Sequence, residues 1–201
     1  MTRMSTSRPY HHGDLRAELL RSAERTLREK GAGALSLREL ARDIGVSHAA
    51  PGRHFKDKQS LLDALALDGY ERMNQSLAAA GLRAGQSFEE RMTALARAYL
   101  GFAVDNPELL ELMFARKHDP ESSAQLAGAV DRSLGSITRL IADAQDQGEI
   151  VQGDPERITT VAAASLHGLA ALIAGCALDA DEVLAGLDEH VHLLLHGLKP
   201  R

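Results

Sequence analysis

The residues of this chain best suited to metal chemistry are two histidines near its carboxyl end. His192 and His196 are four residues apart, so on a helix both imidazoles would lie on one face and could chelate an ion. A solvated face or a pH-sensitive seam between subunits explains the same spacing. We favour that second interpretation and expect no metal ion. His11 and His12 belong to a segment discussed below and are not expected to bind metal either.

Nucleophilic chemistry has weak support in the sequence. Cys176 is the only cysteine, which excludes a disulfide framework. It follows Leu172 and Ile173 at helical spacing, which predicts packing in the core rather than reactivity. The sequence contains no nucleophile elbow and no metalloprotease signature. We therefore predict that the chain is not an enzyme and needs no cofactor.

Basic side chains are concentrated in the first part of the chain. Residues 1–60 contain 12 Lys and Arg against 7 Asp and Glu, a net charge of +5, whereas residues 61–201 carry −10, which makes −5 in all. Clustered cations favour contact with phosphates. The two parts are therefore predicted to meet different partners, although the negative total alone would argue against nucleic acid.

The elements that position these residues are predicted to be helices throughout. Apolar residues recur at helical spacing, and Gly and Pro fall at the breaks. The expected helices cover residues 14–30, 37–44, 48–54, 58–82, 88–106, 107–116, 122–147, 155–177 and 181–197. The predicted fold is therefore all-α with about nine helices. The weakly polar stretch 161–178 is interpreted as a buried helix rather than a membrane span.

Residues 36–55 have the pattern of a helix-turn-helix. Ser36 and Glu39 suit a capping box, Gly45 suits the left-handed end of a helix, and Ser47 suits the cap of the next helix. This geometry places a second helix in the major groove of DNA. An ordinary helical corner is the alternative. The basic residues around it favour DNA: Arg38, Arg42, Arg53, His54, Lys56 and Lys58.

About a third of the chain resembles the DNA-binding domain of the TetR family of bacterial transcriptional regulators. The matching elements are Tyr10-His-His-Gly-Asp-Leu-Arg16, Ser36-Leu-Arg-Glu-Leu-Ala41, Gly45-Val-Ser47, Arg53-His-Phe55 and Lys58-Gln-Ser-Leu-Leu62. The resemblance implies an N-terminal arm and three-helix DNA-binding domain over residues 1–58. It also implies a helical regulatory and dimerisation domain over residues 59–201.

The resemblance further implies which residues meet DNA. Ser36 and Arg38 would lie near phosphates, residues 48–50 would face bases, and Lys58 would meet a phosphate. The full implied set is Ser36, Arg38, Ser47, His48, Ala49, Ala50, Gly52, Arg53, His54 and Lys58. Gly52 stands where the family commonly has Tyr, and it costs about 1 kcal/mol of helix propensity relative to Ala. Pro51 lies in the first turn of the same expected helix.

A stripe of small residues and an apolar last helix predict association between copies of the chain. The stripe consists of Ala164, Gly168, Ala171 and Gly175, and the helix contributes Leu187, Val191, Leu194 and Leu195. These surfaces suit a symmetric four-helix bundle, and the resemblance likewise implies a homodimer through the last two helices. Burial of both faces within one chain is the alternative.

The resemblance implies a small-molecule site among the middle helices. The residues predicted to line it are Phe102, Leu109, Met113, Phe114 and His167, although core packing would explain them equally well. The expected function is a cytoplasmic, ligand-responsive repressor that binds a palindromic double-stranded DNA operator as a dimer. The alternative is a helical small-molecule-binding or scaffold protein with weakened DNA binding. The sequence identifies no effector, and no membrane partner is expected.

Overall fold

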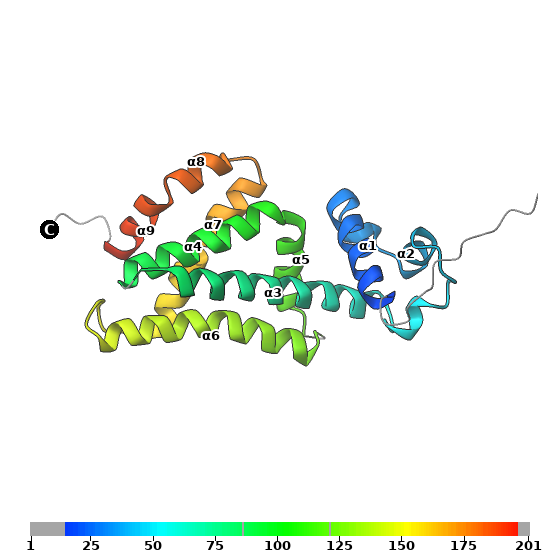
Figure 1. Ribbon diagram of the computed structural model, residues 1–201, viewed down its shortest axis with the longest axis horizontal. Helices are drawn as coiled ribbons and strands as arrows, with labels where there is room; N and C mark the ends of the chain where they lie inside the picture. Colours follow the sequence, from blue (N-terminus) through cyan, green and yellow to red (C-terminus); the bar gives the residue numbers. More distant parts are fainter. Residues whose placement is uncertain (1–14, 86, 121, 197–201) are drawn as a thin grey trace, which may run out of the picture. The chain divides into compact units, whose positions relative to one another are not determined.

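The computed structural model describes residues 15–85, 87–120 and 122–196, and within those ranges every regular element is a helix (Figure 1). The prediction of an all-α fold is therefore confirmed. The predicted N-terminal arm, Tyr10, His11 and His12 lie outside the described residues, as does the end of the last expected helix. The chain divides into two compact units between Leu65 and Ala66.

The first unit is built from three helices and two short 3-10 turns. α1 (Leu15–Lys30) is followed by η1 (Ala32–Ala34), α2 (Leu37–Asp43), η2 (Pro51–Arg53) and the first residues of α3 (Lys58–Arg83). Its core is aliphatic, as the composition predicts, except for Phe55. The guanidinium of Arg16 lies 5.5 Å from the centre of the Phe55 ring, which ties α1 to the segment that follows η2.

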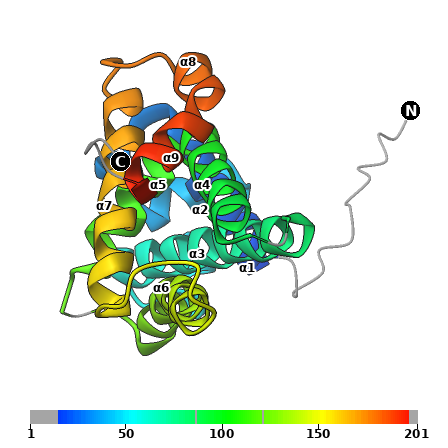
Figure 2. The ribbon, with the colours of Figure 1, turned by 90° about the vertical axis from the view of Figure 1, so that its left-hand side faces the viewer.

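The second unit contains the rest of α3 and six further helices. They are α4 (Phe88–Asp105), α5 (Pro107–Lys117), α6 (Ala124–Asp146), α7 (Pro155–Ala174), α8 (Ala180–Ala185) and α9 (Leu187–His196). α3 and α6 lie side by side, and Asn74 Nδ2 on α3 donates to the Ala129 carbonyl on α6 at 3.1 Å (Figures 1 and 2). α4 packs against both α7 and α9.

Local sequence signals set most helix ends. Asp154 accepts from the Glu156 amide at 2.9 Å, and Pro155 opens α7. Gly148 has a φ of +73° and ends α6. The capping box expected at Ser36 is wrong, because Ser36 makes no side-chain cap bond. A complete capping box is found instead at Ser87 and Glu90, where α4 begins.

The predicted helix over residues 48–54 is wrong in type. This segment is a turn followed by the 3-10 turn η2, and Ala50 rather than Ser47 precedes it. Pro51 has no amide hydrogen to donate. The Ser47 carbonyl instead accepts a hydrogen bond from the Ala50 amide at 2.9 Å, in the tighter i to i+3 pattern. The missing donor therefore removes the i to i+4 bond that residue 51 would give to the Ser47 carbonyl, which weakens an α-helix over this segment.

The last predicted helix is divided in two by Gly186, which ends α8 before α9 begins. Leu187 and Val191, which follow the break, are fully buried, and α9 packs against α4. Both residues were predicted at a dimer interface, and their burial within the chain leaves them little surface for a second copy. Within the described residues the total of nine α-helices is kept only because this division compensates for the loss of the helix over residues 48–54.

α7 differs from its prediction in extent and in burial. It ends at Ala174, and Cys176 beyond it is exposed with a φ of +55°, so the predicted core packing of Cys176 is wrong. The prediction that this helix is buried is also wrong, since Val161 and Leu172 are 61% and 48% exposed. Among the described helices, α7 is the one with the length and mean hydropathy (1.4) to span a membrane, but core helices of soluble proteins also pass that test.

Candidate nucleic-acid interface and ligand cavity

The predicted DNA-contacting residues gather on the part of the first unit that runs from α2 to the start of α3. Gly45 has a φ of +73°, which confirms the predicted left-handed turn after α2. The Val46 amide then donates to the Ala41 carbonyl at 2.9 Å and closes the end of α2. The residues exposed on this surface are Arg38, Ser47, His48, Ala49, Gly52, Arg53 and His54, while Ser36, Ala50 and Lys58 are half-buried.

The cations on this surface have different surroundings. Lys58 Nζ donates to the Gly33 carbonyl at 3.0 Å, which fixes the ammonium near η1 while two of its three hydrogens stay available. Arg42 lies 3.9 Å from Glu39 and 3.8 Å from Asp43, so part of its charge is neutralised. Arg38 and Arg53 are exposed and have no carboxylate partner among the described residues. Arg38 and Arg53 are therefore the better phosphate ligands.

The start of α3 is fixed by its own cap. The Ser60 amide donates to Asp57 Oδ1 at 2.8 Å, so Asp57 caps the helix. This backbone hydrogen bond lowers the pKa of Asp57, so the carboxylate stays ionised. The cap holds Lys58 at the first position of the helix, next to the surface described above.

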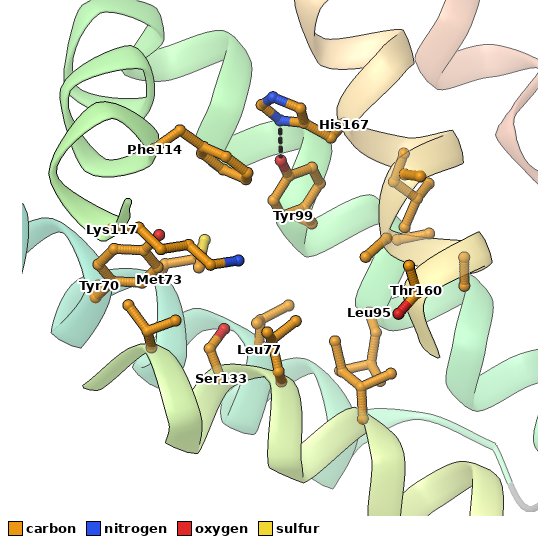
Figure 3. A pocket seen from close by; sticks show the side chains of 18 of the residues that line it. Tyr70, Met73, Leu77, Leu95, Tyr99, Phe114, Lys117, Ser133, Thr160 and His167 are labelled. Carbon is orange, nitrogen blue, oxygen red and sulfur yellow. Dashed lines mark hydrogen bonds between the residues drawn. The ribbon is translucent and has the colours of Figure 1, made fainter. Parts of the chain in front are cut away.

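A cavity of about 280 Å³ lies inside the second unit, and five helices, α3 to α7, form its walls (Figure 3). Most of its lining is aliphatic, with Met73 and Met92 adding flexible thioethers. Its volume is close to the lower end of the range for small-molecule sites. Lys117 on α5 supplies the positive charge of the lining, and its amine points into the cavity.

His167 on α7 is held by two aromatic neighbours at the wall of the cavity. Its Nδ1 lies 3.0 Å from Tyr99 Oη, and its ring stacks on Phe114 with centroids 3.8 Å apart and an angle of 15°. Burial, with a further contribution from Lys117, lowers the pKa of His167, so the imidazole is neutral at pH 7. Burial also raises the pKa of Tyr99, which keeps its hydroxyl protonated. Tyr99 and His167 therefore form an uncharged polar pair, and the Phe114 ring stacks on it.

Lys117 and Tyr70 are functional-site residues that the sequence did not reveal. Lys117 lies 5.6 Å from the centre of the Phe114 ring and has no carboxylate partner among the described residues. Tyr70 is only 3% exposed, and its hydroxyl has no hydrogen-bond partner in the described part of the chain. Burial raises the pKa of Tyr70 to about 12. The sequence placed Lys117 in the break after the helix expected over residues 107–116, a position that gave no sign of a cavity.

Two of the five predicted cavity residues, Phe114 and His167, line the cavity. Leu109 and Met113 instead pack against Gly69 of α3, where a Cβ built on Gly69 would come within 3.2 Å of Leu109 Cγ and 2.6 Å of Met113 Sδ. Phe102 is not among the lining residues. Because Gly69 lets α3 and α5 approach closely, these side chains fill core space and not cavity space.

The predicted stripe on α7 is exposed along its length, as the edge position of α7 in Figure 2 suggests. Ala164, Gly168, Ala171 and Gly175 are all exposed, and Gly175 follows the last helical residue. Leu194 and Leu195 on α9 are half-buried. Ala164 also lines the cavity, so this face and the cavity share one residue.

Comparisons with known proteins agree with the division into a first unit that carries the basic surface and a helical second unit. The family model described as "Bacterial regulatory proteins, tetR family" matches residues 19–65. The model described as "Tetracyclin repressor-like, C-terminal domain" matches residues 92–198, which is more than half of the chain. The chain belongs to the TetR family. Members of this family are DNA-binding transcriptional regulators rather than enzymes.

Individual relatives support the family assignment. A TetR/AcrR-family regulator structure from Thermobifida fusca YX-ER1 is 26% identical, with a TM-score of 0.70, over 93% of this chain and 100% of that one. A Rhodococcus sp. RHA1 structure of unknown function is 45% identical, with a TM-score of 0.84, over 92% and 97%. An HTH-type transcriptional regulator of Mycobacterium bovis is 29% identical over 68% of this chain. The match spans only 59% of that relative's length.

Proposed function

We propose that this TetR-family regulator is a ligand-responsive repressor whose effector is an amphipathic organic anion. The observation that carries the proposal is Lys117, a half-buried ammonium that points into an otherwise largely apolar cavity and lacks a carboxylate partner among the described residues. A charge in such surroundings favours a ligand of opposite sign. The aliphatic walls favour an apolar body attached to that anionic group.

Operator binding is proposed to use the exposed surface from Arg38 to His54. Arg38 and Arg53 would bind phosphates, and His48 would donate to or accept from a base edge. Ala49 offers only apolar contact, for example with a thymine methyl group. Because the segment over 48–54 is a turn and a single 3-10 turn, we expect specificity to rest on few base contacts.

The proposed dimer uses the exposed face of α7. The small residues of this face let a second helix approach closely, and Val161 and Leu172 supply apolar area that the chain itself leaves exposed. Ala164 belongs to this face and to the cavity wall, so a ligand that moves α7 would change the geometry of the dimer. The ligand must bind the DNA-free state more tightly for this movement to release the operator. Because its target is chromosomal DNA, we place the protein in the cytoplasm.

The test combines DNA binding with a matched set of ligands. Fluorescence anisotropy on DNA from upstream of the protein's own gene should give a nanomolar Kd and a steep salt slope. Octanoate should weaken this binding, while octan-1-ol and octylamine, which share its chain but not its charge, should have far less effect. Lys117→Met should abolish the octanoate response and leave operator affinity without ligand unchanged.

Three outcomes would contradict the proposal. Equal responses to octanoate, octanol and octylamine, or an octanoate response that survives in Lys117→Met, would exclude Lys117 as the anchor of an anion. Weak DNA binding that ignores sequence would favour the alternative of a small-molecule-binding or scaffold protein. The experiment can therefore refute the proposed DNA binding and the proposed ligand independently of each other.

A further inference from the structure

One carboxylate and two imidazoles meet where the first turn of α4 faces the last turns of α9. His192 Nδ1 lies 3.1 Å from Glu89 Oε1, and His196 Nε2 lies 3.3 Å from Glu89 Oε2. One ligand atom from each of the three residues lies within 4.8 Å of the others. Although the sequence alone led us to expect no metal ion at the two histidines, the position of Glu89 changes that expectation: we propose that Glu89, His192 and His196 bind a divalent transition-metal ion, and that Zn²⁺ suits them best.

The observed separations fit the coordination shell of zinc. Zinc bonds to histidine nitrogen and carboxylate oxygen are about 2.0–2.2 Å long, so two ligand atoms of a tetrahedral shell lie about 3.4 Å apart. The two contacts to Glu89 are close to this value. Two histidines and one glutamate form a known zinc ligand set that leaves a fourth position for water. Mg²⁺ and Ca²⁺ prefer oxygen ligands, so imidazoles discriminate against them.

The charge and exposure of the cluster also suit a cation. The carboxylate of Glu89 lies within hydrogen-bond distance of both imidazoles, so it offers oxygen ligands next to the two nitrogen ligands. The side chains of His192, Glu89 and His196 are 58%, 43% and 32% exposed, so an ion has access and the rings have room to adjust. Binding would replace the imidazole protons that now face the carboxylate.

The surrounding packing positions the three ligands before any ion arrives. Leu187 and Val191 are buried where α9 packs on α4. Arg97 on α4 reaches both of the last two helices: its Nη2 lies 2.7 Å from Asp188 Oδ1 on α9, and its Nη1 donates to the Leu184 carbonyl on α8 at 3.0 Å. These contacts fix the register of α9 on α4, so the two histidines face Glu89. The ion would then join two segments that are about a hundred residues apart in sequence.

The test uses the full-length protein and Zn²⁺ in competition with a chromogenic chelator. We expect one tight site per chain. Because even an outer-shell partner contributes 10- to 100-fold to metal affinity, Glu89→Gln, His192→Gln and His196→Gln should each weaken it by at least about tenfold. Exposed Glu111 and His118 supply matched controls, and Glu111→Gln and His118→Gln should bind Zn²⁺ as the natural chain does.

Two further measurements keep the test decisive. Co²⁺ bound to the natural chain should give the visible absorption of a low-symmetry site with nitrogen ligands, and Mg²⁺ should not displace it. Circular dichroism checks that each variant is folded. Zinc affinity that is unchanged in all three ligand variants would place the ion elsewhere, for example at His11 and His12, and would overturn the proposal. Failure of the natural chain to compete with the chelator would overturn it as well.

Discussion

Tyr70 and Tyr99 line the same cavity, yet removal of their hydroxyls should have opposite effects on stability. Tyr70 Oη is buried and has no partner in the described chain, whereas Tyr99 Oη lies 3.0 Å from His167 Nδ1. Tyr70→Phe and Tyr99→Phe delete the same atom, so packing and side-chain entropy change little in either case. The difference between the two variants therefore isolates hydrogen bonding.

The magnitudes follow from the state of each hydroxyl. A buried polar group without a partner costs about 1–3 kcal/mol, so Tyr70→Phe should leave the free energy of unfolding unchanged or raise it by up to about that amount. Tyr99→Phe removes a bond of net value about 1 kcal/mol and leaves the half-buried His167 Nδ1 without this partner. It should lower the free energy of unfolding by about 1–2 kcal/mol.

Urea unfolding followed by far-ultraviolet circular dichroism measures both values at pH 7.5 and one protein concentration. Both hydroxyls are protonated there, because burial raises the pKa of each. A loss of more than about 1 kcal/mol in Tyr70→Phe would refute the reasoning, since it would show that Tyr70 Oη makes a favourable bond.

The pH dependence adds a second readout for Tyr70. Its pKa is about 12 in the folded chain and about 10 in an unfolded one. The folded state therefore holds the proton more tightly, and stability falls as the pH rises from 10 towards 12. Tyr70→Phe should remove part of that fall.

Four further predictions concern packing, DNA binding and association. Gly69→Ala should destabilise the chain by about 1–3 kcal/mol, because the new Cβ meets buried Met113, whereas Gly101→Ala, with nothing within 4 Å, should stabilise it by about 0.5–1 kcal/mol in the same urea assay. A Cβ built on Gly52 also meets nothing within 4 Å, and Gly52→Tyr should tighten operator binding by about 1 kcal/mol, roughly fivefold in anisotropy. Gly168→Glu should give monomers in light scattering, while exposed Ala115→Glu should not. Raising NaCl from about 50 to about 200 mM should weaken operator binding and tighten the dimer.

Most of the fold could be predicted because it depends on local signals. Apolar spacing and breaks at Pro and Gly located the helices, and Asp57, Asp154 and Gly148 act at helix ends as their residue types predict. Pro51 shows the limit of this reasoning. A proline in a first turn is tolerated by an α-helix, but here the lost amide leaves only a 3-10 turn. Whether the α-helix or the 3-10 turn forms is decided by neighbouring residues in the fold, which the sequence does not locate.

The cavity was harder to predict because it is a property of packing. Leu109 and Met113 have the right residue types for a pocket, but Gly69 on a distant part of the chain lets α3 approach and uses that space as core. Tyr70 and Lys117 have no sequence signal for a shared cavity, since α3 and α5 bring them there only after folding. The same holds for Glu89, which is about a hundred residues from the two histidines it contacts.

The distribution of charge explains how one chain could associate with itself and with DNA. Residues 61–201 carry a net charge of −10, so two such bodies repel each other. Yet residues 158–178, which include most of α7, contain no charged side chain, and this is where Val161 and Leu172 are exposed. Apolar burial on that face must therefore supply the attraction, and salt should assist it by screening the repulsion between bodies. Salt has the opposite effect on the basic first part of the chain: it weakens DNA binding, because phosphate binding releases counterions. The negative total charge is thus no argument against a DNA partner: attraction to DNA and repulsion between bodies come from different parts of the chain.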